Sequence, residues 1–203
     1  MKISVENLGK RFNREWIFKK LTYDFVPGVY AVTGPNGSGK STLLQTLWGQ
    51  LPASAGVIKY SCEKEIPVEE VFRYTSIATP YMELIEEFTL VEMVRFHFKF
   101  KKAKHNKTAE ELMESMELSH ARDKFISNFS SGMRQRLKLA LAFYSEAEIL
   151  FLDEPTTNLD QKATAWYLKN LAQVPTDCLV FIASNLEQDY PLSAIKIDIL
   201  SYK

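Results

Sequence analysis

Three segments of the chain are apolar at nearly every position and lack the polar alternation of a half-exposed strand. They are Val29–Thr33, Ile149–Leu152 and Leu179–Ile182, and each is rich in β-branched or aromatic residues. Strands of a parallel sheet covered on both faces have this pattern. The helix-like segments that accompany them are residues 40–48, 133–144 and 163–171. This order of strands and helices predicts an α/β fold with a mainly parallel sheet.

Two other regions have different patterns. Ile3–Leu8 and Leu21–Phe25 alternate apolar and polar residues, which predicts a half-exposed antiparallel sheet at the N-terminus. In the middle of the chain, Leu90–Phe100 is aromatic-rich and Thr108–Glu111 has the pattern of a capping box. We therefore expect residues 81–128 to form an inserted helical lobe.

The composition is compatible with one domain. The chain has 203 residues, of which 46% are hydrophobic, enough for a single core. Lysine and arginine total 25 and are balanced by 25 acidic residues, so no net charge attracts nucleic acid, and we expect no nucleic-acid partner. The predicted organisation is a single domain of residues 1–203, with a core of residues 1–80 and 129–203 and the helical subdomain of residues 81–128.

Cysteines and apolar runs indicate a protein of the cell interior. Cys62 and Cys178 lack the spacing of a metal site, and we interpret both as packing residues. The longest apolar run, Cys178–Ala183, is far shorter than the ~20 residues that cross a bilayer, so another chain would have to supply any membrane part. Residues 99–107 carry five lysines and a histidine, which form either a solvated loop or a contact patch for a partner or lipid headgroups.

Residues 34–42 carry the strongest chemical signal. They follow a predicted buried strand, open a predicted helix and match the pattern G-x-x-x-x-G-K-[ST]. Glycines in such a loop let successive backbone N–H groups point at phosphate oxygens, and the helix N-terminus adds partial positive charge. We expect Lys40 to neutralise β- and γ-phosphates and Ser41 to hold Mg²⁺. The predicted phosphate cradle is Gly34, Pro35, Asn36, Gly37, Ser38, Gly39, Lys40, Ser41 and Thr42.

A pair of acids follows another predicted buried strand. Asp153 and Glu154 come directly after Phe151 and Leu152. Ligands bind at the carboxyl ends of strands in open α/β sheets, so these acids are expected to face the phosphate cradle. Asp153 is suited to holding the magnesium ion, and Glu154 to orienting the water that attacks the γ-phosphate.

These motifs together resemble the nucleotide-binding domain of ABC transporters over essentially the whole chain. Phe129–Arg136 lies where that family has its L-S-G-G-Q signature, Pro155–Asp160 resembles its D-loop, and Phe12 occupies the place of the aromatic that stacks on adenine. The resemblance implies a P-loop NTPase core that binds ATP and Mg²⁺ and hydrolyses ATP. The further nucleotide contacts that it implies are Phe12, Ser130, Ser131, Gly132 and Asp160.

The resemblance also implies partners. In the family, each ATP lies between the P-loop of one subunit and the signature of another, and Ser130–Gly132 at a helix start would form the required second anion site. The implied assembly is a homodimer, or a heterodimer with another ABC ATPase subunit. It would dock on a separate integral-membrane subunit at the inner face of the cytoplasmic membrane. Tyr81–Phe100 is expected to carry the docking face.

The chain departs from the family pattern at several places, among them Ser131, which replaces a glycine of the signature. Asn185 stands where the family has a histidine that contacts the γ-phosphate, and it cannot supply a positive charge. Ser76–Tyr81 lacks the family's magnesium-sensing glutamine, and Met133 replaces the glutamine of the signature. Loss of one transition-state contact commonly costs a factor of about 10² in rate, so we expect Asn185 to support slow hydrolysis.

Two other functions remain compatible with these motifs. One is a soluble ABC-type ATPase switch that acts on nucleic acid or ribosomes, although such proteins commonly carry paired ATPase domains or a basic extension. The other is a nucleotide-binding regulator with little turnover, which Asn185 and the absent glutamine favour. Neither the transported cargo nor the direction of transport follows from the residues.

Overall fold

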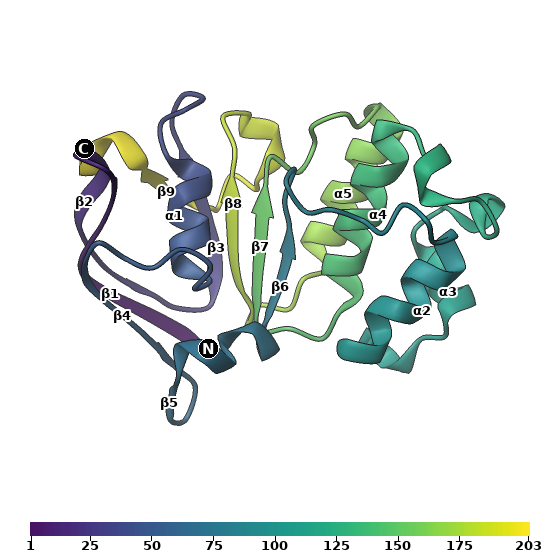
Figure 1. Ribbon diagram of the computed structural model, residues 1–203, viewed down its shortest axis with the longest axis horizontal. Coiled ribbons are helices and arrows are strands. Elements are labelled where there is room, and N and C mark those ends of the chain that lie inside the picture. The colour runs from purple at the N-terminus through teal and green to yellow at the C-terminus, as the bar shows by residue number, and fades with distance from the viewer. The chain divides into compact units, whose positions relative to one another are not determined.

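The computed structural model describes every residue from Met1 to Lys203. The contacts between its residues divide the chain into two units (Figure 1). Unit 1 comprises residues 1–75, 147–154 and 175–203, and unit 2 comprises residues 76–146 and 155–174.

The alternating N-terminal segments form an antiparallel sheet in unit 1, as predicted. Its strands are β1 (Lys2–Phe12), β2 (Glu15–Phe25), β4 (Ala55–Ser61) and β5 (Glu65–Ile66), in the spatial order β2-β1-β4-β5. Ile3, Val5 and Phe25 are buried, whereas Glu6 and Asp24 are exposed. Successive side chains of a strand point to opposite faces, so the alternation in the sequence becomes one apolar and one solvated face.

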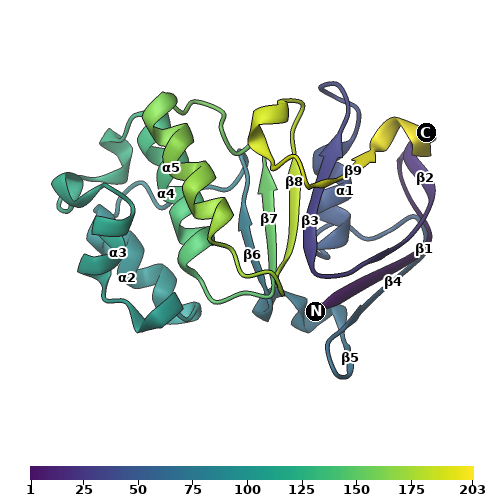
Figure 2. The same cartoon turned by 180° about the vertical axis from the view of Figure 1, so that it is seen from behind.

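The apolar segments form parallel strands, which confirms the α/β prediction. They are β3 (Gly28–Thr33), β7 (Ile149–Asp153) and β8 (Leu179–Ala183). Two strands that the sequence did not indicate, β6 (Thr75–Ala78) and β9 (Ile195–Asp198), complete the sheet, whose order is β6-β7-β8-β3-β9. Every residue of β7 and β8 is buried. The ring of Phe181 lies 5.0 Å from that of Phe151 and 5.5 Å from that of Tyr30, in stacked geometry. The helix α1 (Lys40–Leu47) packs against β7 and β8. In Figure 2 it lies behind the sheet, near β3.

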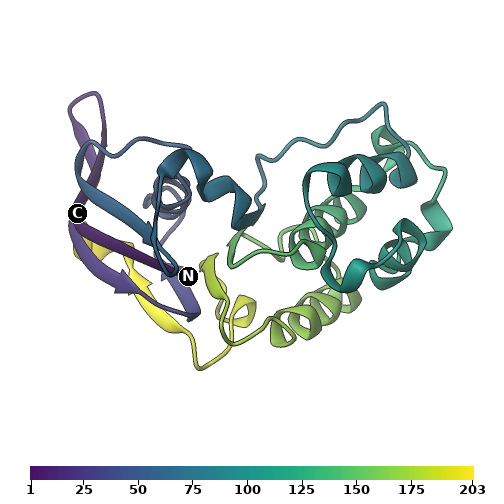
Figure 3. The same cartoon turned by 90° about the horizontal axis from the view of Figure 1, so that it is seen from below.

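Short 3₁₀ helices complete unit 1. They are η1 (Val68–Arg73), η5 (Glu187–Asp189) and η6 (Ile199–Tyr202). The last of these lies against β2, so the C-terminal segment is beside the N-terminal strands (Figure 3).

Unit 2 is helical. Its α-helices are α2 (Leu90–Phe100), α3 (Ala109–Ser115), α4 (Ser131–Tyr144) and α5 (Gln161–Ala172), and its 3₁₀ helices are η2 (Lys104–Asn106), η3 (Ser119–Ala121) and η4 (Ile126–Asn128). No helix of the structure is both long enough and apolar enough to span a bilayer.

The boundary of unit 2 differs from the predicted subdomain of residues 81–128. The unit also includes α4 and α5, because these helices pack on each other and on the end of α3. The ring of Phe143 lies 5.9 Å from that of Tyr167, and the hydroxyl of Tyr144 donates to the carbonyl oxygen of Ser115 at 2.9 Å. Helical periodicity identifies each helix, but only tertiary packing shows which helices share a unit.

Capping boxes begin two of these helices. The backbone N–H of Thr108 donates to Glu111 at 2.7 Å, and the N–H of Glu111 donates to the Thr108 hydroxyl at 3.2 Å, as the sequence predicts. Thr89 and Glu92 form a second box at the start of α2, which the sequence analysis missed. Both boxes satisfy N–H groups that have no partner within the helix.

Replacing Thr108 with alanine should lower the free energy of unfolding by about 1 kcal/mol, because the N–H of Glu111 loses its acceptor. Thr108→Ser keeps the hydroxyl and should retain most of the stability. Urea unfolding followed by circular dichroism measures both variants. Equal losses in the two variants would show that the cap contributes nothing.

Candidate nucleotide-binding site

The carboxyl ends of three parallel strands lie side by side in unit 1. Val32 of β3 pairs with Ala183 of β8, and Ala183 pairs with Asp153 of β7. The glycine-rich loop follows β3, Glu154 follows β7, and Asn185 follows β8. The register of the sheet therefore brings segments that are far apart in the sequence to one edge, where α/β sheets bind ligands.

The loop between β3 and α1 has a backbone conformation that requires glycine. Gly34, Gly37 and Gly39 have φ angles of 141°, 76° and 106°. Such angles cost little only in the absence of a Cβ atom. A Cβ on Gly39 would lie 2.3 Å from Cγ2 of Ile17, and one on Gly34 would lie 2.8 Å from Oγ of Ser38. The glycines therefore keep the loop tight enough for backbone N–H groups to line its inner side.

Lys40 closes this loop. It begins α1, is 5% exposed, and its Nζ donates to the carbonyl oxygens of Gly34 at 2.9 Å and Pro35 at 3.2 Å. The ammonium group therefore lies at the loop that phosphate would occupy. Oγ of Ser38 is buried without a hydrogen-bond partner, so the loop retains polar capacity for a ligand. Thr42 follows in the first turn of α1, and its carbonyl oxygen accepts from the hydroxyl of Thr46 at 2.7 Å.

Asp153 is the most unusual ionisable group of the site. It is 1% exposed, and its Oδ1 has no hydrogen-bond partner. Burial raises its pKa from 3.8 to about 6, a hydrogen bond from Ser41 opposes this shift, Glu154 adds to it, and Lys40 lowers the pKa. A buried carboxylate beside a serine hydroxyl is an oxygen-ligand set of the kind that Mg²⁺ prefers. The residues present thus fit a magnesium ion held by Ser41 and Asp153.

Glu154 has a strained backbone. Its φ is 46°, in the left-handed region that few residues other than glycine adopt, and its N–H donates to the carbonyl oxygen of Ala183 at 2.8 Å. Such strain persists where the surrounding structure imposes it, and it is common at functional sites. Here the pairing of β7 with β8 imposes it and turns the chain sharply after Asp153.

Asn185 lies within reach of the phosphate loop. Its Nδ2 donates to Oδ1 of Asn36 at 3.4 Å. The preceding Ser184 donates its hydroxyl to Oδ2 of Asp189 at 2.6 Å and accepts from the N–H of Leu186 at 3.0 Å. Asp189 is 1% exposed. This buried pair holds the turn that presents Asn185, and sequence reasoning missed it because Ser184 and Asp189 belong to no motif.

Phe12 is exposed at the end of β1. Its side chain is 46% accessible, and Nζ of Lys10 lies 5.1 Å from the ring centroid. An exposed aromatic face beside a cation suits stacking on a nucleobase. That role remains a prediction.

The other predicted contacts belong to unit 2 and begin helices. Oγ of Ser130 accepts from the N–H of Met133 at 3.2 Å and caps α4, while Ser131 is exposed. A Cβ on Gly132 would lie 3.0 Å from the carbonyl oxygen of Asn158. Asp160 caps α5, where it accepts from the N–H of Ala163 at 2.7 Å.

Two contacts of α4 were not anticipated from the sequence. Nε2 of Gln135 donates to the carbonyl oxygen of Pro155 at 2.9 Å, which ties α4 to the D-loop segment. Nζ of Lys138 donates to the carbonyl oxygens of Pro80 at 2.8 Å and Thr79 at 3.4 Å. These two carbonyl groups belong to Ser76–Tyr81, the segment in which the family's glutamine would be expected. Lys138 of α4 therefore contacts the segment from which that glutamine is absent.

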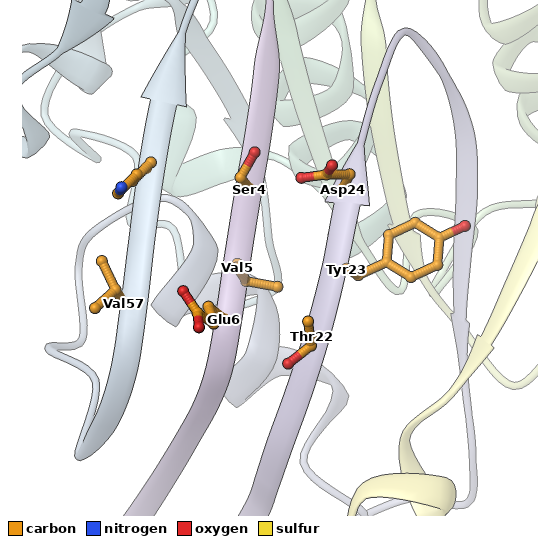
Figure 4. A pocket seen from close by; sticks show the side chains of 8 residues that line it. Ser4, Val5, Glu6, Thr22, Tyr23, Asp24 and Val57 are labelled. Carbon is orange, nitrogen blue, oxygen red and sulfur yellow. The ribbon is translucent and has the colours of Figure 1, made fainter.

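A separate depression of about 500 Å³ lies on the antiparallel sheet (Figure 4). Ser4 and Asp24 are at the same level of neighbouring strands, and hydrogen bonds from Ser4 and Lys2 lower the pKa of Asp24. On the other side of β1, Glu6 pairs with Val57 of β4. No residue predicted to contact nucleotide lines this depression, so it is separate from the site.

The raised pKa of Asp153 predicts that the free energy of unfolding of the apoprotein depends on pH. The folded state binds the proton more tightly than the unfolded state, so stability falls as pH rises from about 4 to about 6 and stays lower above that range. In EDTA at pH 8, Asp153→Asn should therefore raise the free energy of unfolding, by on the order of 2 kcal/mol. The advantage should shrink toward pH 4. Thermal unfolding of both proteins across this range measures it, and a constant difference would contradict the assignment.

Comparisons with known proteins agree with this geometry. The family model described as ABC transporter matches residues 18–157. A probable iron chelatin transport ATP-binding protein of Helicobacter pylori is 34% identical over 182 residues, which are 82% of this chain and 70% of that protein. A sulfate/thiosulfate import ATP-binding protein of Thermosynechococcus vestitus is 31% identical, with 93% of this chain and 58% of that protein covered.

A solved structure gives the same fold. It is that of a putative ABC transporter ATP-binding protein from Pyrococcus furiosus, which matches with a TM-score of 0.82 at 21% identity and covers 100% of this chain and 99% of that one. At this identity the likeness concerns the fold alone. The family match, the relatives and the geometry agree: the chain belongs to the ABC transporter family, as an ATP-binding protein.

Proposed function

We propose that this protein hydrolyses ATP and thereby drives a separate membrane subunit of an ABC transporter, through closure of a dimer. Its family establishes an ATP-binding protein of the ABC type, for which ATPase activity is general. One observation carries the proposal of hydrolysis by this chain. A buried carboxylate oxygen without a partner lies next to Ser41, and Glu154 follows it on the same strand end.

Each residue of unit 1 has a distinct role in this proposal. The N–H groups of the glycine-rich loop and the ammonium of Lys40 bind the phosphates. Ser41 and Asp153 would hold Mg²⁺, which when bound neutralises charge on the phosphates. Glu154 would orient the attacking water and accept its proton, and Asn185 would donate a hydrogen bond to the γ-phosphate. Phe12 would stack on the adenine.

The helix starts of unit 2 would act on a second nucleotide. The hydroxyl of Ser131 and the N–H groups around Gly132 stand at the start of α4, where the helix dipole favours an anion. Asp160 is the N-cap of α5, so it also lies at a helix start. By its resemblance to the family, this chain would bind a partner's ATP here. A dimer, either with a second copy or with a related subunit, would then be part of the mechanism.

The exposed aromatics of unit 2 support docking on a membrane subunit. Tyr81 and Phe100 are 74% and 75% exposed, and Phe96 contacts Phe88 and Phe100 in edge-on geometry at 5.4 and 5.2 Å. Exposed apolar clusters of this kind mark protein interfaces. The relatives are named as transport and import ATP-binding proteins, which supports a place at the inner face of the cytoplasmic membrane.

Turnover is proposed to be slow. Asn185 forms a hydrogen bond with Asn36 but brings no positive charge to the γ-phosphate. If purified protein together with its membrane partner shows no magnesium-dependent hydrolysis, the chain is a nucleotide-binding regulator instead.

Replacing Glu154 with glutamine should abolish hydrolysis and trap an ATP-bound dimer, because the amide binds water but cannot accept its proton. Light scattering after gel filtration in Mg-ATP measures the dimer, and release of phosphate measures the rate. Glu63→Gln, an exposed acid in unit 1, serves as the control and should leave both unchanged. A variant that stays monomeric at saturating Mg-ATP would count against the dimer mechanism.

Asn185→His should raise the rate of hydrolysis by a factor of about 10², since one transition-state contact commonly contributes that much. Asn185→Ala should lower the rate instead, because the amide donor is lost. Steady-state ATPase assays should show the change in kcat rather than in KM. If all three proteins have the same kcat, position 185 does not contact the γ-phosphate.

A further inference from the structure

Unit 2 contains a cavity of about 510 Å³ that the nucleotide site does not use. It lies among α3, α5 and the C-terminal end of α4, and Figure 1 labels these helices. One face of α5 lines it with residues spaced three or four apart, so their side chains point the same way. The lining residues are Lys107, Glu114, Ser115, Glu117, Tyr144, Lys162, Ala165, Trp166, Lys169, Asn170 and Gln173.

The inner wall of this cavity is held by hydrogen bonds. The carbonyl oxygen of Ser115 is an acceptor for both the Tyr144 hydroxyl and Nε1 of Trp166, each at 2.9 Å. Nζ of Lys107 donates to Oγ of Ser115 at 2.7 Å. Nδ2 of Asn170 donates to the carbonyl oxygen of Trp166 at 2.8 Å. The wall is therefore prearranged, and a ligand would not have to order it.

The rim of the cavity carries more positive than negative charge. Lys162 and Lys169 lie seven residues apart on α5, about 10 Å along the helix axis, and Lys107 faces them from the segment before α3. Glu117 is already shared by Lys162 at 3.2 Å and Arg136 at 3.0 Å. The only other acid of the lining is Glu114. The charges of Lys107 and Lys169 are therefore balanced by a single carboxylate. Lys169 is exposed and forms no ion pair.

This arrangement selects for a particular ligand chemistry. The volume is within the range of about 300–1,000 Å³ that is usual for pockets that bind small molecules. Lysine presents a compact point charge, which suits phosphate oxygens, whereas planar carboxylates are better matched by arginine forks. Cations spread over about 10 Å favour a ligand with more than one phosphate charge.

We propose that this cavity binds a small, multiply charged organic phosphate at Lys107, Lys162 and Lys169. Such a ligand would bridge α5 and the segment that precedes α3, beside the end of α4. The opposite ends of α4 and α5 carry Ser130 and Asp160. Binding would therefore stiffen the packing of the two helices whose starts are proposed to contact nucleotide. This site is independent of the phosphate loop and of hydrolysis.

The test uses the full chain carrying Lys40→Ala, which removes the principal phosphate ligand of the nucleotide site. Calorimetric titration with inorganic tripolyphosphate in low salt should show one binding site. Adding Lys107→Gln and Lys169→Gln together should weaken binding by about tenfold or more, because two charge-assisted contacts are lost. Adding Lys19→Gln and Lys99→Gln, two exposed lysines outside the cavity, should leave the affinity unchanged.

The single variant Lys169→Gln controls for an effect on folding, since Lys169 lies on the surface. It should still weaken binding and should leave the melting temperature unchanged. Raising the salt concentration should also weaken binding. Absence of binding, or equal affinity in the cavity and control variants, would overturn the proposal. Citrate binding as tightly as tripolyphosphate would overturn the assignment to phosphates.

Discussion

A carboxylate buried at the end of an apolar strand is unfavourable unless a cation or several donors compensate for it. Asp153 is in this position, and its raised pKa of about 6 shows that Ser41 and Lys40 compensate only in part. The proposed nucleotide site is centred on this incompletely compensated carboxylate. A magnesium ion at the proposed site would supply the missing charge, so the residue that destabilises the apoprotein would also favour binding of the metal with its nucleotide.

The backbone builds the site as much as the side chains do. Gly34 and Gly39 allow the loop to fold tightly over the start of α1, and Glu154 has a left-handed conformation that its pairing with Ala183 enforces. β7 and β8 supply this enforcement because each lies between two neighbouring strands of the sheet. Strain at Glu154 is therefore supported by the most deeply buried part of unit 1.

Unit 2 uses its helix starts and helix ends differently. Ser130 and Asp160 already accept hydrogen bonds as caps, so an anion at these starts would depend mainly on Ser131, on backbone N–H groups and on the helix dipoles. At the other end of the same helices, Tyr144 and Asn170 enclose a cavity rimmed by lysines. The two helices thus connect the proposed nucleotide contacts with the proposed phosphate cavity, and binding at one would alter affinity at the other if the helices move as units.

The sequence by itself determined five of the strands (β1, β2, β3, β7 and β8), the α-helices and the phosphate loop, because hydrophobic periodicity and glycine spacing are local properties. It did not indicate β4, β5, β6 or β9. It predicted the Thr108 cap and the position of the Asp153–Glu154 pair at a strand end for the same reason. Only the tertiary structure decided that α4 and α5 belong with α2 and α3, and that Asp189 holds the turn at Ser184. It alone also brought Lys107 to the same cavity as Lys169. These features depend on contacts between residues distant in the chain, and no local pattern encodes which of several apolar faces will meet.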